Sequence, residues 1–460
     1  MNSVLRFFTV TLCLFSFFQQ GYAKGNTDDD QIIVKLTTES QLIPLYLNSF
    51  VSPDNSFDRN YLTKLADILE FDLSYNGMTQ VVNHSADKDR IAAKYKFEQL
   101  DDLNSWKALN VFYVIKVQVE NKKLAVRMLA VNSTSMKKAD DISLTGDISQ
   151  DRRQMHRVAD MIHKALFDTT GIATTHILYT VKKAVENKQP IAEVWETDYD
   201  GGNARQVTNE NSLCVMPTYI PPKTGFMTNS FLYVCYRNGQ PKIYLGNLKG
   251  GKGQRLTFMR GNQLMPAISH QRNNVAFICD VTGNPDLFVQ PFSPEAGALG
   301  KPQQVFSTFK ATQGTPTFSP EGDRLAFVSN KDGSPRIYIL KIPAPGTKLG
   351  DIKATLITKH GKESTAPAWS PDGSKLAYSS MTNGARQIWI YDFETREERQ
   401  LTQGPGHKEN PAWGPNSLHL TFNSVTPQGS DLYLVNLNQP EAVKITSGSG
   451  ENRFPSWEQR

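Results

Sequence analysis

Two kinds of hydrophobic pattern divide the chain at about residue 170. Before that point, short apolar runs alternate with helical stripes. Runs at 32–36 and 42–50 predict strands, and runs at 112–119 and 124–131 flank a polar tripeptide, as the two arms of a β-hairpin would. The mixture predicts a small α/β domain after residue 23.

Two helices are expected in this domain. Apolar residues over 62–69 recur at helical spacing after Ser56 and Asp58, and either of these polar residues could cap the helix. A second apolar stripe over 155–166 predicts a helix that closes the domain. This pattern indicates a compact fold of residues 24–170 and names no chemistry.

From residue 171 onward the pattern is a repeat of short strands. The two clearest copies run from Pro316 to Ser329 and from Pro367 to Ser380, and each opens with Pro-x-aromatic-Ser-Pro-acidic-Gly. Fainter copies begin at Pro217, Pro266, Pro411 and Pro455, so the anchor proline recurs every 44 to 51 residues. Four short strands with tight turns fit that period, which is typical of a propeller blade.

The repeated residues have structural tasks. A proline at the head of a strand needs no ladder donor, and Ser-Pro-Asp-Gly sets a tight turn in which the glycine can take a positive φ. A large aromatic residue recurs once per copy and supplies apolar area for blade packing. These residues are Trp195, Tyr244, Phe288, Tyr338, Trp389 and Tyr433.

The two ends of the repeat array complement each other. Residues 176–208 supply the later strands of a blade without its proline-aromatic opening, and that opening appears at the C-terminus as Phe454-Pro-Ser-Trp457. The last strand should therefore complete the first blade and remove the free edges of the array. We expect a mainly β chain, with a six-bladed β-propeller over 171–460 preceded by the small α/β domain over 24–170.

The first 23 residues resemble a secretory signal. One positive charge precedes a short apolar stretch, and Gly21-Tyr22-Ala23 offers small residues for cleavage before Lys24. An uncleaved anchor is the alternative. Cys13 lies inside the apolar stretch and follows Leu12, which argues against a lipoprotein. No later segment is long and apolar enough to span a bilayer, so we expect no integral membrane segment after cleavage.

Charge and cysteine content narrow the function only slightly. The 50 lysines and arginines against 45 aspartates and glutamates give a net charge of +5 with no clustered run, which argues against a nucleic-acid partner. Cys214, Cys235 and Cys279 remain after signal removal. Because an odd number cannot pair completely, free buried thiols are expected.

An enzyme is the main alternative, as a propeller-fold hydrolase or lyase. A serine hydrolase needs Gly-x-Ser-x-Gly at its nucleophile, and the chain has no such sequence. Sialidase-type boxes separate their Asp and Gly by one residue, whereas Asp372 and Gly373 are adjacent. The sequence therefore favours no catalytic residue and no cofactor.

Metal-binding patterns are weak. His156 and His163 are the closest histidine pair and would share one helix face. Asp198, Asp200 and Asn203 could contact a calcium ion, but a Gly-Gly hairpin turn explains them equally well. We expect no metal site.

The repeats and their arrangement resemble the TolB family, the periplasmic propeller component of the Tol-Pal envelope system. The order of signal peptide, α/β domain, repeats and a Phe-Pro-Ser-Trp ending is similar, and residues 71–77 resemble the family's Asp-Leu-x-x-Ser-Gly segment, with Asn76 in place of serine. The resemblance implies a periplasmic, non-enzymatic protein that binds other proteins and serves envelope integrity and cell division.

The resemblance also implies two partners. A TolA-like inner-membrane protein would bind the N-terminal segment, which here departs from the family pattern at Asp28-Asp29-Asp30; the candidate contacts are Ile32, Ile33, Val34, Lys35 and Leu36. The peptidoglycan-associated lipoprotein Pal would bind at one mouth of the propeller channel.

The mouth can be located from the repeat. The first strand of each blade lines the channel, so the two residues before each anchor proline should ring one mouth. These are Val215, Met216, Leu264, Met265, Gly314, Thr315, Thr365, Ala366, Glu409, Asn410, Arg453 and Phe454. Half of the ring is apolar. It could bind a partner through Met and Phe anchors, or simply plug the channel as a packed core.

Overall fold

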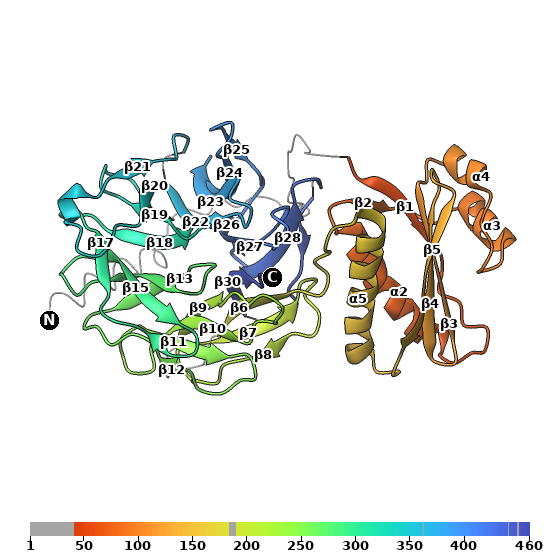
Figure 1. Ribbon diagram of the computed structural model, residues 1–460, viewed down its shortest axis with the longest axis horizontal. Helices are drawn as coiled ribbons and strands as arrows, with labels where there is room; N and C mark the ends of the chain where they lie inside the picture. The colour runs from red at the N-terminus through yellow and green to blue at the C-terminus, as the bar shows by residue number, and fades with distance from the viewer. Residues whose placement is uncertain (1–40, 184–189, 362, 440, 449) are drawn as a thin grey trace.

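The computed structural model describes residues 41–183, 190–361, 363–439, 441–448 and 450–460. Figure 1 shows the propeller-like β part on the left and the α/β part on the right, with two helices between them. The strand predicted at 32–36 lies outside the described residues. Among those described, no helix has the length and apolar content needed to cross a membrane.

The α/β part is built on one sheet with the strand order β2-β1-β3-β4-β5. Its strands are β1 (Ile43–Leu47), β2 (Thr79–Val81), β3 (Tyr113–Glu120), β4 (Lys123–Ala130) and β5 (Ser135–Ser143). β1 is parallel to both β2 and β3, and the other pairs are antiparallel. The predicted hairpin is confirmed, since Glu120 pairs with Lys123 and both turn residues, Asn121 and Lys122, have a positive φ.

Two long helices cover the face of this sheet that is turned toward the propeller (Figure 1). α2 (Arg59–Ser74) begins at Asp58, whose carboxylate accepts the Tyr61 N–H at 2.8 Å, so Asp58 and not Ser56 is the cap. α5 (Ile148–Phe167) is the predicted closing helix. The short helices α3 (Ala86–Lys94) and α4 (Leu103–Ala108), which the hydrophobic pattern did not predict, pack on the opposite face around Trp106.

The described strands after residue 175 pair in six antiparallel sets, one for each anchor proline. The first set joins β30 (Glu451–Trp457), β6 (His176–Lys183), β7 (Ile191–Asp198) and β8 (Arg205–Gln206). The second is β9 (Cys214–Tyr219), β10 (Ser230–Cys235), β11 (Lys242–Asn247) and β12 (Gln254–Arg255). The third is β13 (Gln263–Ile268), β14 (Asn274–Cys279), β15 (Asp286–Ser293) and β17 (Gln303–Phe306), with β16 (Gly297–Ala298) added to β15.

The remaining three sets follow the same plan. The fourth is β18 (Gln313–Phe318), β19 (Arg324–Ser329), β20 (Arg336–Lys341) and β21 (Ala354–Leu356), with the 3₁₀ turn η1 (Leu349–Asp351) before its last strand. The fifth is β22 (Ser364–Trp369), β23 (Lys375–Thr382), β24 (Ala385–Asp392) and β25 (Glu398–Gln400). The sixth is β26 (His407–Trp413), β27 (His419–Thr426), β28 (Gly429–Asn436) and β29 (Val443–Lys444). The mainly β, propeller-like fold is thereby confirmed.

The C-terminal strand pairs with the first strand of the repeat region. β30 runs antiparallel to β6, and Trp457 packs in the core and donates its Nε1–H to Thr175 Oγ1 at 2.8 Å. A single parallel pair, Ser430 with Glu451, connects β30 to the sixth set. The division at residue 170 stays a prediction.

The repeated residues act as the sequence indicated. In the Ser-Pro-Asp-Gly turn, Gly373 has a φ of +77° and donates its N–H to the Ser370 carbonyl at 2.9 Å. Each recurring aromatic residue faces a second aromatic across the neighbouring strand. The pairs are Tyr179–Trp195, Tyr233–Tyr244, Phe277–Phe288, Phe327–Tyr338, Tyr378–Trp389 and Phe422–Tyr433.

The expectation of free thiols was wrong for two cysteines. Cys214 and Cys235 are directly paired residues of β9 and β10, and they form a disulfide. Cys279 is a free, buried thiol, as expected. The number of cysteines could not predict this disulfide, because disulfide formation depends on strand register. The register places Cys214 opposite Cys235 but Gln263 opposite Cys279.

Candidate functional site at the channel mouth

The residue before each anchor proline has a left-handed backbone. The φ values are 56° for Met216, 55° for Met265, 35° for Thr315, 51° for Ala366, 54° for Asn410 and 55° for Phe454. A residue with a Cβ pays about 1–2 kcal/mol for this conformation, and strained residues of this kind cluster at functional sites. The first strands of the six sets therefore carry six equivalent strained positions.

A β-bulge accompanies each of these residues. The pairing register between the first and second strands shifts at the anchor proline in all six sets. A bulge removes residues from the ladder and redirects their side chains. The six positions are thus released from sheet pairing in the middle of the innermost strands.

One arc of the mouth is apolar. Met216, Met265 and Phe454 are half-buried and pack against one hydrophobic cluster, which contains the buried side chains of Val215 and Leu264. Methionine adapts its shape to a partner, and a neighbouring aromatic ring can act as a rigid anchor. This arc has the composition of an adaptable protein contact.

The other arc is polar and charged. Arg386 donates its Nη1–H to Thr365 Oγ1 at 3.2 Å, and its Nε lies 3.7 Å from Glu409 Oε1. Burial raises the pKa of the Glu409 carboxyl, while Arg386 and Arg453 oppose that shift. The charges across this arc are balanced within the protein.

The two arcs meet at Asn423. Its Oδ1 accepts the side-chain N–H of Asn410 at 2.9 Å and the backbone N–H of Phe454 at 3.3 Å. A side chain of the sixth set therefore contacts the backbone of the closing strand, and each pair of predicted mouth residues lies within the first strand of its set. Their role in binding a partner stays a prediction.

Two aromatic residues between strand sets are highly exposed. Phe258 lies between β12 and β13 and Phe309 lies between β17 and β18, in loops that lead into the innermost strands; they are 77% and 82% exposed. Sequence analysis missed both. Phe258 occupies the repeat position that is polar in two other copies, as Lys359 and Gln403. A phenylalanine at a position that is otherwise polar could have pointed to an exposed aromatic residue.

Comparison with known proteins identifies the family. Residues 163–343 and 349–459 match the family described as "TolB beta propeller domain". The chain is 58% identical over 385 residues to a protein TolB homolog of Protochlamydia amoebophila, covering 83% of this chain and 82% of that protein. The chain belongs to the TolB family.

Other relatives agree with this assignment. A protein TolB homolog of Chlamydia caviae is 35% identical over 378 residues, covering 82% of each chain. The crystal structure of TolB from Acinetobacter baumannii has a TM-score of 0.74 at 19% identity, covering 94% of this chain and 100% of that one, which supports the fold. The chain is thus a TolB-type protein of the Tol-Pal system, and TolB proteins are non-enzymatic propellers.

A second polar cluster of this TolB-family chain joins its two parts. His156 on α5 places Nδ1 2.8 Å from Asp72 Oδ2 on α2, and Tyr199 donates its hydroxyl to Asp72 Oδ1 at 2.9 Å. Asp198 and Asp200, at the end of β7 and in the following turn, lie 3.6 and 3.8 Å from His156 Nε2. All of these side chains are at least nine-tenths buried.

Asp198, Asp200 and Asn203, considered above for calcium, contribute to this cluster and its turn. Arg152 ion-pairs with both aspartates and supplies the positive charge that a cation would bring. Burial lowers the pKa of His156, but Asp72, Asp198 and Asp200 together outweigh burial and raise the pKa to about 10. The turn therefore docks the propeller on α5.

The second histidine of α5 is also structural. His163 is buried, and its Nε2 lies 3.0 Å from Thr169 Oγ1. The predicted N-terminal contact segment, residues 32–36, lies outside the described residues. Of the two predicted partner-binding regions, the channel mouth is the one that lies among the described residues.

Proposed function

We propose that this chain is a periplasmic adaptor of the Tol-Pal system. Its propeller mouth binds the peptidoglycan-associated lipoprotein Pal, and its N-terminal segment, Ile32 to Leu36, binds a TolA-like inner-membrane protein. Linking the two membranes in this way serves envelope integrity and cell division.

One observation carries the lipoprotein contact. Six strained, bulged positions lie in the first strands of the six sets, where Met216, Met265 and Phe454 pack on one hydrophobic cluster, and Phe258 and Phe309 are exposed in loops that lead into two of these strands. A strand end that only faces water would more often be polar, and strain is retained where function requires it. A partner with a matching apolar surface would bury these side chains.

Co-purification tests this function. The mature chain, isolated from its native envelope under mild conditions, should retain Pal through washing, and Phe258→Ser with Phe309→Ser should reduce the amount retained. Phe226→Ser, in the loop between β9 and β10 and similarly exposed, is the matched control and should retain the full amount. Equal recovery with all variants would argue against binding at the mouth.

A further inference from the structure

One loop departs from the repeat at the end of the propeller opposite the mouth. The first two strands of most sets are joined by a five-residue turn, such as 319–323 or 370–374, whereas residues 220–229 join β9 to β10. Pro221 and Pro222 stiffen the base of this loop. At its tip, Phe226 and Met227 are 73% and 74% exposed.

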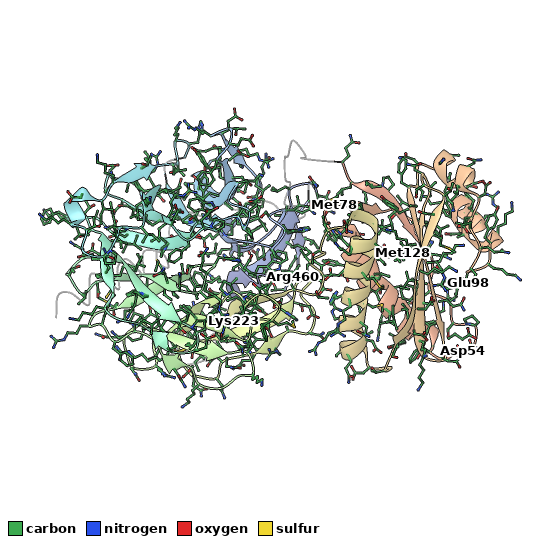
Figure 2. The ribbon with its side chains drawn as sticks, in the orientation of Figure 1. Asp54, Met78, Glu98, Met128, Lys223 and Arg460 are labelled. Carbon is green, nitrogen blue, oxygen red and sulfur yellow. A yellow bond between two sulfur atoms is a disulfide. The ribbon has the colours of Figure 1, made fainter. Side chains whose placement is uncertain are left out.

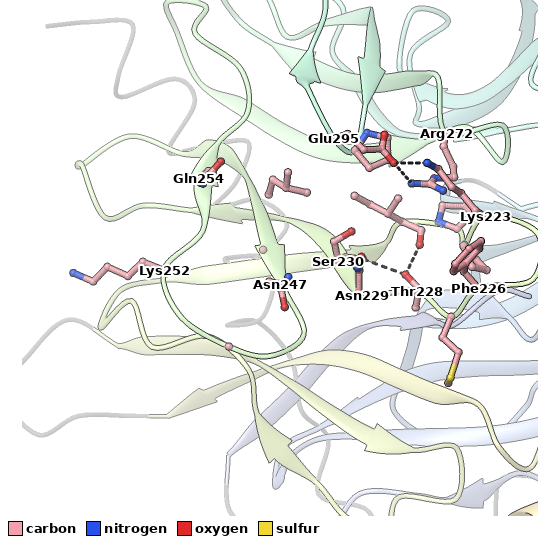
Figure 3. Close-up of a pocket in the computed structure, with 18 residues that line it drawn as sticks. Lys223, Phe226, Thr228, Asn229, Ser230, Asn247, Lys252, Gln254, Arg272 and Glu295 are labelled. Atoms are coloured by element: carbon pink, nitrogen blue, oxygen red, sulfur yellow. Dashed lines mark hydrogen bonds and ion pairs between the residues drawn. The ribbon is translucent and has the colours of Figure 1, made fainter.

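The loop of residues 220–229 separates two cavities. Figure 3 shows the first, of about 560 Å³, lined by amide and hydroxyl groups such as Asn229, Ser230 and Asn247. The second is a cleft of about 890 Å³ between the loop, α5 and the C-terminus; Arg460, labelled in Figure 2, lies beside α5 there. Phe226 and Met227 line both cavities.

The cleft presents positive charge outward. Its exposed cations are Arg153, Arg157, Arg205, Lys223 and Arg460, of which Lys223 pairs with Glu295 and Arg460 with Asp160. Its acids are buried and neutralised: Glu196 pairs with Arg205, Asp198 with Arg152, and Glu458 with His176. No acidic side chain among the described residues pairs with Arg153 or Arg157. These two guanidinium groups are available to an anionic partner.

We propose that this cleft binds an acidic, extended segment of a second protein. Carboxylates of the segment pair with Arg153 and Arg157 on α5, and one of its apolar side chains packs on Phe226 and Met227. Concave shape favours a peptide over a membrane, because the cations line a cleft that a flat bilayer cannot enter. The site lies at the far end of β9 from the mouth and does not depend on the proposed lipoprotein contact.

Peptide selection on the whole mature protein tests this proposal. Twelve-residue peptides displayed on phage are selected, and the enriched sequences are synthesised and titrated by fluorescence anisotropy. The selected peptides should combine several Asp or Glu residues with one large apolar residue. Arg153→Glu with Arg157→Glu, and separately Phe226→Ser, should each weaken their binding at least tenfold, and higher salt should weaken it further.

Matched controls separate this site from the mouth. Phe258→Ser should leave peptide binding unchanged, and Phe226→Ser should leave lipoprotein binding unchanged. Peptides without acidic residues, or peptides that bind all variants equally, would overturn the proposal.

Three other results would also overturn the proposal, because each would show a different occupant of the cleft. Anionic vesicles of phosphatidylglycerol that bind through Phe226 would point to a membrane. Loss of a dimer in the Phe226→Ser variant would point to a second copy of the chain. Peptide binding that tightens tenfold when Asp28, Asp29 and Asp30 are replaced by Asn would point to the chain's own N-terminal segment.

Discussion

The sulfur of Met265 accepts a hydrogen bond from the backbone N–H of Thr315 at 3.1 Å. The two residues occupy the same position in consecutive repeats, and both have a positive φ. The bond joins a flexible side chain of one repeat to the backbone of the next. The third and fourth strand sets are therefore linked at this position.

The backbone strain at the mouth can be tested at Ala366, because its side chain is a single methyl group and its replacement by Gly changes little else. Replacing Ala366, whose φ is 51°, with Gly removes a steric cost and should raise the free energy of unfolding by up to about 1 kcal/mol. The matched control, Ala377→Gly in the buried interior of β23, should lower it by about 1 kcal/mol. Urea unfolding measures both, and equal losses would contradict the strain.

The closing strand should hold the repeat region together. Deleting residues 453–460 removes most of β30 and leaves the edge of β6 unpaired, so the melting temperature should fall and aggregation should follow. Trp457→Ala, which removes a buried ring, should act in the same direction, while Trp389→Ala at a less buried position should cost less. An unchanged melting curve for the truncated chain would refute closure.

The proposed division near residue 170 can be tested by cleavage. A protease site inserted at the exposed residues 168–170 should be cut to give two fragments. These fragments should still elute together, because buried contacts of Tyr199 with Asp72 and of Asp198 with His156 cross the junction. Separation of the fragments in physiological salt would show that these contacts contribute little to the association of the two parts.

The His156 cluster predicts how stability depends on pH. Because the folded pKa is raised to about 10 from 6.5, the contribution of the protonated ring is complete below pH 6.5 and is lost as the pH rises toward 10. The free energy of unfolding should therefore fall between pH 7 and 9.5, by at most about 1.4 kcal/mol per pH unit from this proton.

Two variants isolate that contribution. His156→Gln should be less stable at pH 7 but should lose less on going to pH 9.5, whereas the exposed His270→Gln should keep the slope of the parent chain. Urea titrations at several pH values give the slopes. A parent-like slope in His156→Gln would mean that this ring is not protonated in the folded protein.

The sequence predicted the parts of the fold that local chemistry determines. Proline at a strand head and the glycine of Ser-Pro-Asp-Gly act through their own backbones. The repeat period and the closing strand could therefore be predicted from the sequence. β5 was missed because it is an exposed edge strand rich in Lys and Asp, and it lacks an apolar alternation.

Features that depend on tertiary contacts could not be predicted from the sequence. The Cys214–Cys235 disulfide depends on strand register. The partners of Asp198 and Asp200 come from α5, which precedes them in sequence and meets them only through docking. Positive φ at the six mouth residues was also unexpected, because a residue before proline usually prefers extended backbone.

The most direct test of the account is the affinity of the mouth for Pal. Isothermal titration of the soluble lipoprotein domain into the Met265→Asp, Phe454→Asp double variant should show at least about thirtyfold weaker binding than the parent chain, since truncating a buried anchor commonly costs ~2 kcal/mol or more. Circular dichroism should show an intact fold, and Phe226→Ser should bind as the parent does. Full affinity in a well-folded double variant would place the lipoprotein elsewhere.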